Sequence, residues 1–433
     1  MKRIKLILAS VLVRLSQIER KIEMFYMDEQ VDESYIIKLR TRLIRFVSIS
    51  NIKRYKNEKY EELRQFPIST KEIYKSFGEH NLKSRFYKLM SFYNMNTGGS
   101  TGEPYEFIVS SKAGIVDSLH QKYQHKKIGF EDGDRIVVFN GCIIDGLDVS
   151  KNIFWKKKSQ KELPFGSVEF STHYLNPETF IFYYHQLENI KPAIIRSYPS
   201  AFLEFTKMLM LNKIQCGFNL KGIQLTSEVV SEKEIEELES YWGDIVYHQY
   251  GHSEASVIAS RYPGEDCYTF SPYYGDVEIL DEQDRAVAVG EVGRIVVTSW
   301  HNYARPFIRY DTGDLARLKS IKGSKVKVSE IIGRSQDYLM DKFGYKVSVA
   351  GLVFGQHFEA FSKIIKWQFV DNGNGNILIK VVPFEKLLSV DKHEIINRVN
   401  INENFNITLV EVDDLVKTKR GKHQLVIKGK HSE

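Results

Sequence analysis

Cysteine is scarce in this sequence, and its placement excludes the structures that cysteines most often build. Cys142, Cys216 and Cys267 are the only cysteines in 433 residues, and no Cys-x-x-Cys spacing occurs. An odd and scattered set does not suit a disulfide framework, and three thiols cannot form a four-cysteine zinc site. We therefore expect buried thiols, no zinc, and a reducing, cytoplasmic environment.

The sequence also lacks an apolar run long enough to cross a membrane. Residues 6–13 form an apolar run of eight between Lys5 and Arg14, whereas a transmembrane helix needs about twenty. Charged residues follow this run where a signal peptide would have a small-residue cleavage site. We expect no integral membrane span and an amphipathic helix that rests on the protein body, with a membrane surface as the alternative.

Neither sign of charge is in strong excess. Lys plus Arg total 61 and Asp plus Glu total 55, so the net charge is +6. So small a surplus does not favour a nucleic-acid partner. A phosphate-rich small substrate accounts equally well for the basic clusters at residues 156–158 and 417–422. With 42% hydrophobic and 27% charged residues, the composition is that of a soluble globular protein.

The pattern along the chain changes twice. The first ninety or so residues are dense in helix formers, and the stretch that follows alternates short β-branched runs with helical segments. Strands that alternate with helices indicate an α/β fold. We predict a large multi-layered domain of sheets and helices at residues 1–336, with a helical lead-in at 1–90, and a small mobile α+β domain at 337–433.

A segment rich in glycine and hydroxyl groups is the first candidate functional motif. Residues 96–104 read Asn-Thr-Gly-Gly-Ser-Thr-Gly-Glu-Pro. The exposed backbone N–H groups of such a loop can surround phosphate oxygens, and its hydroxyls add donors. It is not a Walker A loop, because Gly102 is followed by Glu103. By itself the segment is equally consistent with a plain surface turn.

Two further segments carry nucleotide-binding chemistry. Residues 250–254 place an aromatic ring, a glycine, a hydroxyl and a carboxylate together, which suits a base, a phosphate and Mg²⁺. Asp314 follows a Thr-Gly pair and suits ribose hydroxyls. The structural alternatives are a strand-to-loop junction with a solvated Glu254, and an Asx-type turn.

Two segments near the end complete the set. Residues 333–337, Gly-Arg-Ser-Gln-Asp, lie where the composition changes and are a candidate hinge. Residues 417–422 form a basic turn, for which a solvated tail is the simpler explanation by itself. In this order and spacing, the five segments resemble the adenylate-forming superfamily of acyl-CoA synthetases, adenylation domains and luciferases. The phenylacetate–CoA ligase subgroup, with relatives in capsular polysaccharide biosynthesis, is the most similar.

The resemblance covers nearly the whole chain and implies a role for individual residues. It implies activation of a carboxylic acid by ATP and Mg²⁺ to acyl-AMP, followed by transfer to CoA. The implied loop over the β- and γ-phosphates is Thr97, Gly98, Gly99, Ser100, Thr101 and Gly102. The other implied ATP-binding residues are Ser227 and Glu228 along the adenine, Tyr250 stacked on it, Gly251, Ser253 on the α-phosphate, Asp314 on the ribose and Arg334 on the ribose or phosphate.

The catalytic roles are implied in the same way. Glu254 is the implied Mg²⁺ ligand, Arg334 assists, and Lys422 is implied to reach the carboxylate and the α-phosphate. Asp337 is the implied hinge of the small domain. One departure stands out, because Tyr105 follows Pro104 where the superfamily commonly has lysine. The loss of that charge is expected to weaken ATP use.

The acid and the acceptor remain open at this point. The implied acid-binding pocket has polar members, which favours a polar acid, although ordinary core packing is the alternative for its aromatic members. Its residues are Phe139, Tyr198, Gln224, Tyr247, His248 and Gln249. Besides transfer to CoA, the alternatives are transfer to an amine, a sugar or a carrier protein, and a non-catalytic nucleotide-binding relative. A homodimer is a further open possibility.

Overall fold

The computed structural model describes residues 2–96, 105–158, 166–334, 338–343, 346–348, 363–383, 385–400, 404–417 and 424–429. The chain forms two compact units, and each combines two stretches of sequence. The first unit contains Met1–Asp134 and Tyr247–Ile332, and the second contains Arg135–Val246 and Gly333–Glu433.

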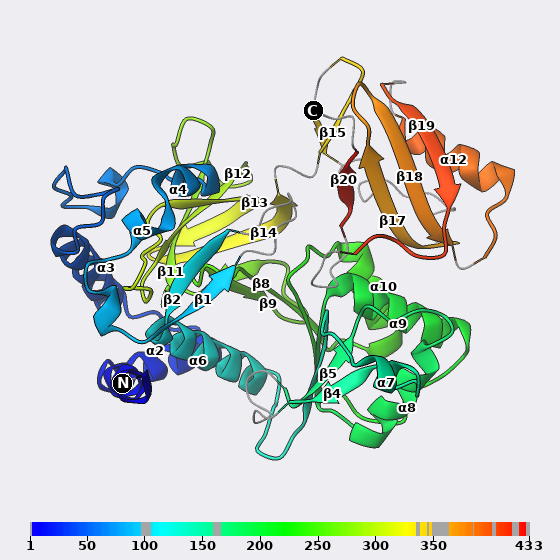
Figure 1. The fold of residues 1–433 in the computed structure, drawn as a ribbon, viewed down its shortest axis with the longest axis horizontal. Coiled ribbons are helices and arrows are strands. Elements are labelled where there is room, and N and C mark those ends of the chain that lie inside the picture. The colour runs from blue at the N-terminus through cyan, green and yellow to red at the C-terminus, as the bar shows by residue number, and fades with distance from the viewer. Residues whose placement is uncertain are drawn as a thin grey trace. The chain divides into compact units, whose positions relative to one another are not determined.

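Helices dominate the start of the first unit, as the sequence predicts (Figure 1). In α3 the Asp32 side chain caps the first turn by accepting from the Tyr35 N–H. Ile36, Leu39 and Leu43 recur at helical spacing and are buried, so this face packs into the core. The helices of this unit are α1 (Lys2–Leu15), α2 (Ile18–Asp28), α3 (Glu33–Ile49), η1 (Leu63–Gln65), α4 (Lys71–Phe77), α5 (Glu79–Leu82), η2 (Tyr87–Leu89) and α6 (Ser111–Lys127).

Helix α4 begins directly after Thr70. Thr70 is the N-cap, and its side chain accepts from the Ile73 N–H. The backbone of Ser69 is used elsewhere, because it donates to the Arg309 carbonyl and accepts from the Asp311 N–H, each at 3.0 Å. Ser69 therefore forms a bridge to strand β13.

The first unit contains an antiparallel sheet that carries the candidate site residues Tyr250 and Asp314. Its strands follow the spatial order β11-β12-β13-β14-β10-β9-β8, and β1 and β2 form a separate hairpin. The strands are β1 (Phe92–Asn96), β2 (Glu106–Ser110), β8 (Val246–Gly251), β9 (Ile258–Arg261), β10 (Tyr268–Phe270), β11 (Gly275–Leu280), β12 (Val292–Ser299), β13 (Tyr310–Lys322) and β14 (Lys325–Arg334).

The second unit combines a mostly parallel sheet with a smaller mixed sheet. Strands β7, β6, β3 and β5 are parallel neighbours, and β4 pairs antiparallel with β5. Buried apolar residues fill all of β3 except its last position, as expected for a strand covered on both faces. These elements are β3 (Ile136–Asn140), α7 (Gly146–Val149), β4 (Trp155–Lys157), β5 (Val168–Ser171), α8 (Phe180–Ile190), β6 (Ile194–Ser197), α9 (Pro199–Leu211), β7 (Gly222–Thr226) and α10 (Glu232–Trp242).

The smaller sheet has the order β19-β18-β17-β20 and its own apolar cluster. Trp367, Phe369 and Ile379 lie in this cluster together with Ile395 of α12. The elements are β15 (Tyr338–Met340), β16 (Lys346–Ser348), β17 (Ile364–Asp371), β18 (Asn376–Pro383), α12 (Ser389–Val399), β19 (Asn406–Glu411) and β20 (Val426–Lys428). The predicted fold class, large α/β layers with a small α+β part, is confirmed.

Within the described ranges, every helix is too short or too polar to pass through a bilayer.

Candidate nucleotide-binding site

The end of strand β8 places Tyr250 against Asp314. The Tyr250 hydroxyl donates to Asp314 Oδ2 at 2.7 Å. Burial, and secondly the negative charge of Asp314, raise the pKa of Tyr250 well above its ordinary value. Tyr250 therefore stays protonated and orients the carboxylate. Gly251 follows Tyr250 in the chain. A Cβ atom at this position would lie 3.2 Å from the Val257 carbonyl oxygen, so the backbone of Gly251 passes close to that of Val257.

Asp314 is positioned by a bulge within β13, where the sequence suggested a turn. The β12–β13 register shifts between Arg294 and Val296, leaving residues 312–314 outside regular pairing. The Gly313 N–H donates to Asp311 Oδ1 at 2.9 Å, and Gly313 adopts a φ of 78°. Both are typical of an Asx-type turn, which is present inside the strand. Such bulges commonly re-aim a side chain near a site.

Glu254 is a buried carboxylate in the turn after β8, with only 5% of its surface exposed. Tyr310 donates to Oε1 at 3.3 Å, and His252 Nδ1 lies 3.0 Å from Oε2. Burial alone would raise the pKa of Glu254, but His252 and the hydrogen bonds outweigh burial and lower it. Glu254 is thus ionised at neutral pH.

The chemistry of the two carboxylates, Glu254 and Asp314, fits a magnesium-bound nucleotide. In the described part of the chain, the ion-pair partner of Glu254 is His252, with no lysine or arginine beside it. His252 Nε2 is also buried without a hydrogen-bond partner among these residues. Buried charges and polar atoms normally have partners. No group of three or more potential metal ligands occurs in the described ranges, whereas Mg²⁺ commonly uses one or two carboxylates plus phosphates.

A second group is centred on Arg305, whose side chain is fully buried. Its guanidinium donates to Glu79 at 3.2 Å and to the Tyr105 hydroxyl at 2.5 Å. It also lies 4.2 Å from the ring centre of Tyr74, and Tyr74 stacks on Tyr310 at 5.6 Å. Arg305 therefore supports Tyr310, the residue that donates to the buried carboxylate described above.

Tyr105 has a structural role that the sequence comparison did not suggest. It is buried, and its hydroxyl donates to Glu79 Oε2 at 3.1 Å while accepting from Arg305. The aromatic residue at the position of the common lysine therefore anchors the start of β2. The predicted phosphate loop itself, Thr97, Gly98, Gly99, Ser100, Thr101 and Gly102, lies outside the described residues.

In the second unit, two predicted segments lie side by side. Ser227 follows β7 with a φ of 73°, a strained conformation for a non-glycine residue. Glu228 accepts from the Ser200 N–H, at the first turn of α9, at 3.1 Å. A Cβ on Gly333 would lie 2.8 Å from Val229. The 227–229 segment therefore lies against the end of β14, immediately before Arg334.

Some predicted residues cannot be placed. Arg334 ends β14 but its side chain is not described, and the predicted hinge Asp337 and the predicted catalytic Lys422 lie outside the described residues. Ser253 is half-buried in the turn before Glu254. For these residues the sequence-based roles stay predictions.

The six predicted pocket residues are divided between the units. In the second unit Phe139 packs within an aromatic core, with its ring 5.1 Å from that of Phe170. In the first unit Tyr247 stacks on Tyr262 at 5.6 Å, and His248 Nδ1 lies 2.7 Å from the Tyr268 hydroxyl. Half-buried Tyr198 and buried Gln224 and Gln249 complete the set. The acid-binding pocket stays a prediction.

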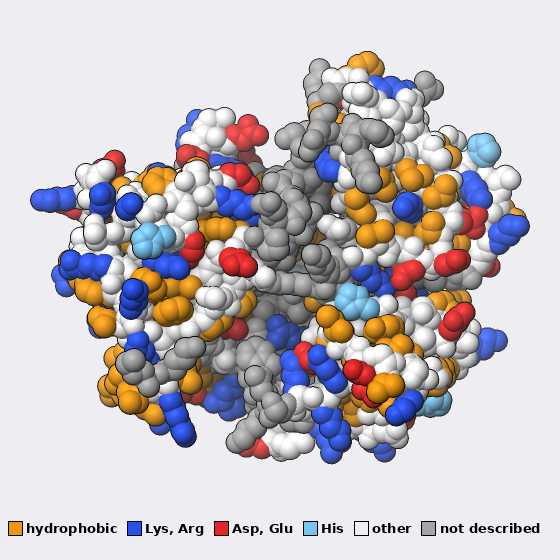
Figure 2. Space-filling model, in the orientation of Figure 1, with side chains coloured by type: hydrophobic (Ala, Val, Ile, Leu, Met, Phe, Trp, Pro, Cys, Tyr) orange, Lys and Arg blue, Asp and Glu red, His pale blue; other side chains and the backbone are white. Residues whose placement is uncertain are grey.

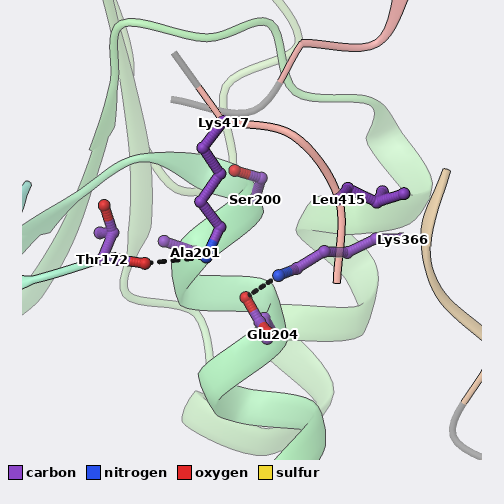
Figure 3. A pocket seen from close by; sticks show the side chains of 7 residues that line it. All are labelled: Thr172, Ser200, Ala201, Glu204, Lys366, Leu415 and Lys417. Atoms are coloured by element: carbon purple, nitrogen blue, oxygen red, sulfur yellow. Dashed lines mark hydrogen bonds and ion pairs between the residues drawn. The ribbon is translucent and has the colours of Figure 1, made fainter. Parts of the chain in front are cut away.

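A pocket of the second unit, between α9 and β17, holds a group of charges that the sequence did not reveal (Figure 3). Lys366 pairs with Glu204 at 2.5 Å, and each of these side chains is less than a tenth exposed. Lys417 donates to the Thr172 carbonyl at 2.9 Å and pairs with Asp414. A solvated tail is the simpler explanation of residues 417–422 taken alone, but the Lys417 side chain is only 12% exposed and belongs to this ionic cluster.

The comparisons with known proteins identify the fold. No family model and no curated protein sequence matches the chain. A 2-hydroxyisobutyryl-CoA ligase in the postadenylation state with R3-HIB-AMP matches with a TM-score of 0.64 at 16% identity, over 92% of this chain and 90% of that one. The same ligase in the same state, with 2-HIB-AMP, matches with a TM-score of 0.63 at 16% identity, over 92% of this chain and 90% of that one.

The same ligase with 2-HIB-AMP and CoA, in the thioesterification state, matches with a TM-score of 0.54 at 17% identity, over 92% of this chain and 89% of that one. The chain therefore has the fold of adenylate-forming ligases. The resemblance seen in the sequence motifs is confirmed at the level of the fold.

Proposed function

We propose that this chain binds ATP with Mg²⁺, activates a carboxylic acid as acyl-AMP, and passes the acyl group to CoA. One observation carries the proposal: buried, ionised Glu254 lacks a lysine or arginine partner in the described part of the chain, and its charge acts on Tyr250, which donates to Asp314. The adenylate-forming fold supports it, as does the ligase of similar fold that binds an acyl adenylate and CoA.

Each residue has a distinct task in this scheme. Asp314, oriented by Tyr250, accepts hydrogen bonds from the ribose hydroxyls, and the Tyr250 ring stacks on the base. Glu254, held by Tyr310, binds Mg²⁺, which would offset the negative charge where a carboxylate approaches the α-phosphate. Lys422 is proposed to bring a second positive charge to the same place. Rotation of the small domain about Asp337 would then exchange Lys422 for a different surface during thioester formation.

The acid and the subgroup are finer proposals that rest on the sequence. Polar residues among the predicted pocket members favour a polar acid, and the motifs favour a phenylacetate–CoA ligase-like enzyme with a role in cell-envelope polysaccharide synthesis. ATP–pyrophosphate exchange, measured over a panel of aryl, amino and hydroxy acids, tests the adenylation step. The panel then identifies the acid, and adding CoA or an amine to the best acid identifies the acceptor.

Asp314→Asn is expected to raise the KM for ATP about tenfold or more in this assay. The neutral amide loses charge-assisted hydrogen bonds to the ribose, each of which contributes about 1.5–3 kcal/mol. Asp266→Asn is the matched control, because this side chain is 81% exposed. An unchanged KM in Asp314→Asn would place the ribose elsewhere.

Lys422→Ala is expected to lower the rate of ATP–pyrophosphate exchange about a hundredfold, the effect of removing one stabilising charge from a transition state. Thioester formation from preformed acyl-AMP and CoA should be spared. Lys386→Ala, at an exposed position of the same unit, should change neither reaction. Equal exchange with and without the Lys422 ammonium would exclude its catalytic role.

A further inference from the structure

Helix α1 presents its large apolar side chains to solvent. Ile4, Ile7, Leu8 and Leu15 are 63%, 56%, 56% and 75% exposed, whereas Ala9 and Val13 are buried. A surface helix of a globular protein ordinarily does the reverse and buries its largest apolar face. Exposed apolar patches of this kind mark interaction surfaces.

The exposed residues form a continuous stripe. Their spacing of three and four residues puts them on one face of the helix, opposite the buried Ala9 and Val13. Figure 2 shows hydrophobic side chains gathered at the position of α1, next to lysine and arginine side chains. The members of the apolar face are Ile4, Ile7, Leu8, Val11, Leu12 and Leu15, whereas Leu6 projects from the side that carries Ala9 and Val13.

The charges of α1 all have one sign. The helix contains basic residues and no Asp or Glu. Arg3 and Arg14 are exposed at one border of the apolar face, and half-buried Lys5 lies at the other. Glu19, on the following helix, is paired with Lys122 at 2.9 Å. An apolar stripe bordered by cations complements a surface that offers acyl chains beneath anionic headgroups.

A neighbouring segment extends this surface. The Lys5 ammonium donates to the Lys88 carbonyl, which places the end of η2 beside α1. Leu89, the next residue, is 75% exposed. Apolar and basic side chains thus continue from α1 onto the adjoining segment.

We propose that α1 binds the surface of an anionic lipid bilayer, lying in the plane of the headgroups with its Ile4–Leu15 face in the acyl region. Fourteen helical residues span about 21 Å, which is shorter than the roughly 30 Å hydrocarbon core. The helix therefore lies on the membrane and does not cross it. This inference is independent of the proposed ligase activity and would bring the enzyme to lipid-linked or amphiphilic substrates.

Vesicle flotation of the full chain tests the proposal. We expect the wild type to float with vesicles of mixed phosphatidylcholine and phosphatidylglycerol, and far less with phosphatidylcholine alone. Leu8→Glu/Leu15→Glu should lower the partition into vesicles at least about tenfold, since two leucine side chains that would be buried in the bilayer are lost. Arg3→Gln and Arg14→Gln should each lower it about fivefold. Val289→Glu, 68% exposed elsewhere in the same unit, should bind as the wild type does.

Opposite results would overturn the proposal. A wild type that stays with the soluble fraction, or a Leu8→Glu/Leu15→Glu variant that floats normally, excludes membrane binding by α1. Equal binding to neutral vesicles excludes the anionic preference. A dimer seen by light scattering, dissolved by Leu8→Glu/Leu15→Glu and without vesicle binding, would assign the face to a second copy of the chain. Thermal unfolding of each variant checks that the fold is retained.

Discussion

Glu254→Gln is expected to lower ATP–pyrophosphate exchange about a thousandfold while the protein stays folded. The amide keeps the size of the side chain and can still accept from Tyr310, which lies 3.3 Å away. It loses the negative charge that is proposed to hold Mg²⁺. Metal ions supply several kcal/mol to such transition states, and about 1.4 kcal/mol corresponds to a tenfold change in rate.

The pH dependence should follow the pKa of Glu254. His252 and hydrogen bonds outweigh burial and hold this pKa below its ordinary value of 4.5. Glu254 therefore stays ionised, and able to hold a cation, at every pH above that ordinary value. The difference in exchange between wild type and variant should persist from neutral pH down to about pH 5.

Glu278→Gln is the matched control. Glu278 is also a buried glutamate of the first unit, but Arg309 donates to both of its oxygens, at 3.0 and 2.9 Å. Removing its charge leaves a guanidinium unpaired, so stability should fall by about 3 kcal/mol while the folded fraction keeps its activity. If the two variants lost activity and stability in the same proportion, Glu254 would be structural.

The sequence was most informative where chemistry is concentrated in short segments. Tyr250 and Glu254 are only four residues apart, and the charges of Asp314 and Glu254 both raise the pKa of Tyr250. The partner of each carboxylate was less evident. Tyr310 stands just before the Asp-Thr-Gly-Asp segment, so its position was the one available signal for its contact with Glu254.

Clusters built from distant segments could not be predicted. The Arg305 group joins residues from α5, the chain just before β2 and the chain before β13, and no spacing in the sequence links Glu79, Tyr105 and Arg305. The same limit applies to Lys417, which belongs to a basic run but is held by Thr172 and Asp414. A run of basic residues can be read from the sequence, but which of its side chains is buried depends on tertiary packing.

The buried ion pair formed by Glu204 and Lys366 also has a large expected effect on stability. Lys366→Met should lower the free energy of unfolding by about 3 kcal/mol, because Glu204 stays buried without the ammonium at 2.5 Å. Burial already raises the pKa of Glu204 despite this partner. Urea unfolding followed by far-UV circular dichroism measures the change.

A double variant distinguishes an unpaired buried charge from a packing defect as the cause of the stability lost in Lys366→Met. Glu204→Met/Lys366→Met should recover to within about 1 kcal/mol of the wild type, since an apolar pair of similar volume replaces a buried ion pair at little cost. Lys392→Met should cost under about 1 kcal/mol, because its side chain is 40% exposed and its partner Glu411 is 24% exposed.

The pH dependence of the Lys366→Met deficit decides between charge and packing. Without the ammonium, the folded-state pKa of Glu204 should rise further above its unfolded value. A group of that kind stabilises the folded state below its unfolded pKa and loses this contribution as pH rises through the folded pKa. The deficit should therefore shrink from neutral pH towards pH 5, as Glu204 becomes protonated and needs no cation. A deficit that is the same at both pH values, or a double variant as unstable as Lys366→Met, would mean that the lysine acts through its packing and not through its charge.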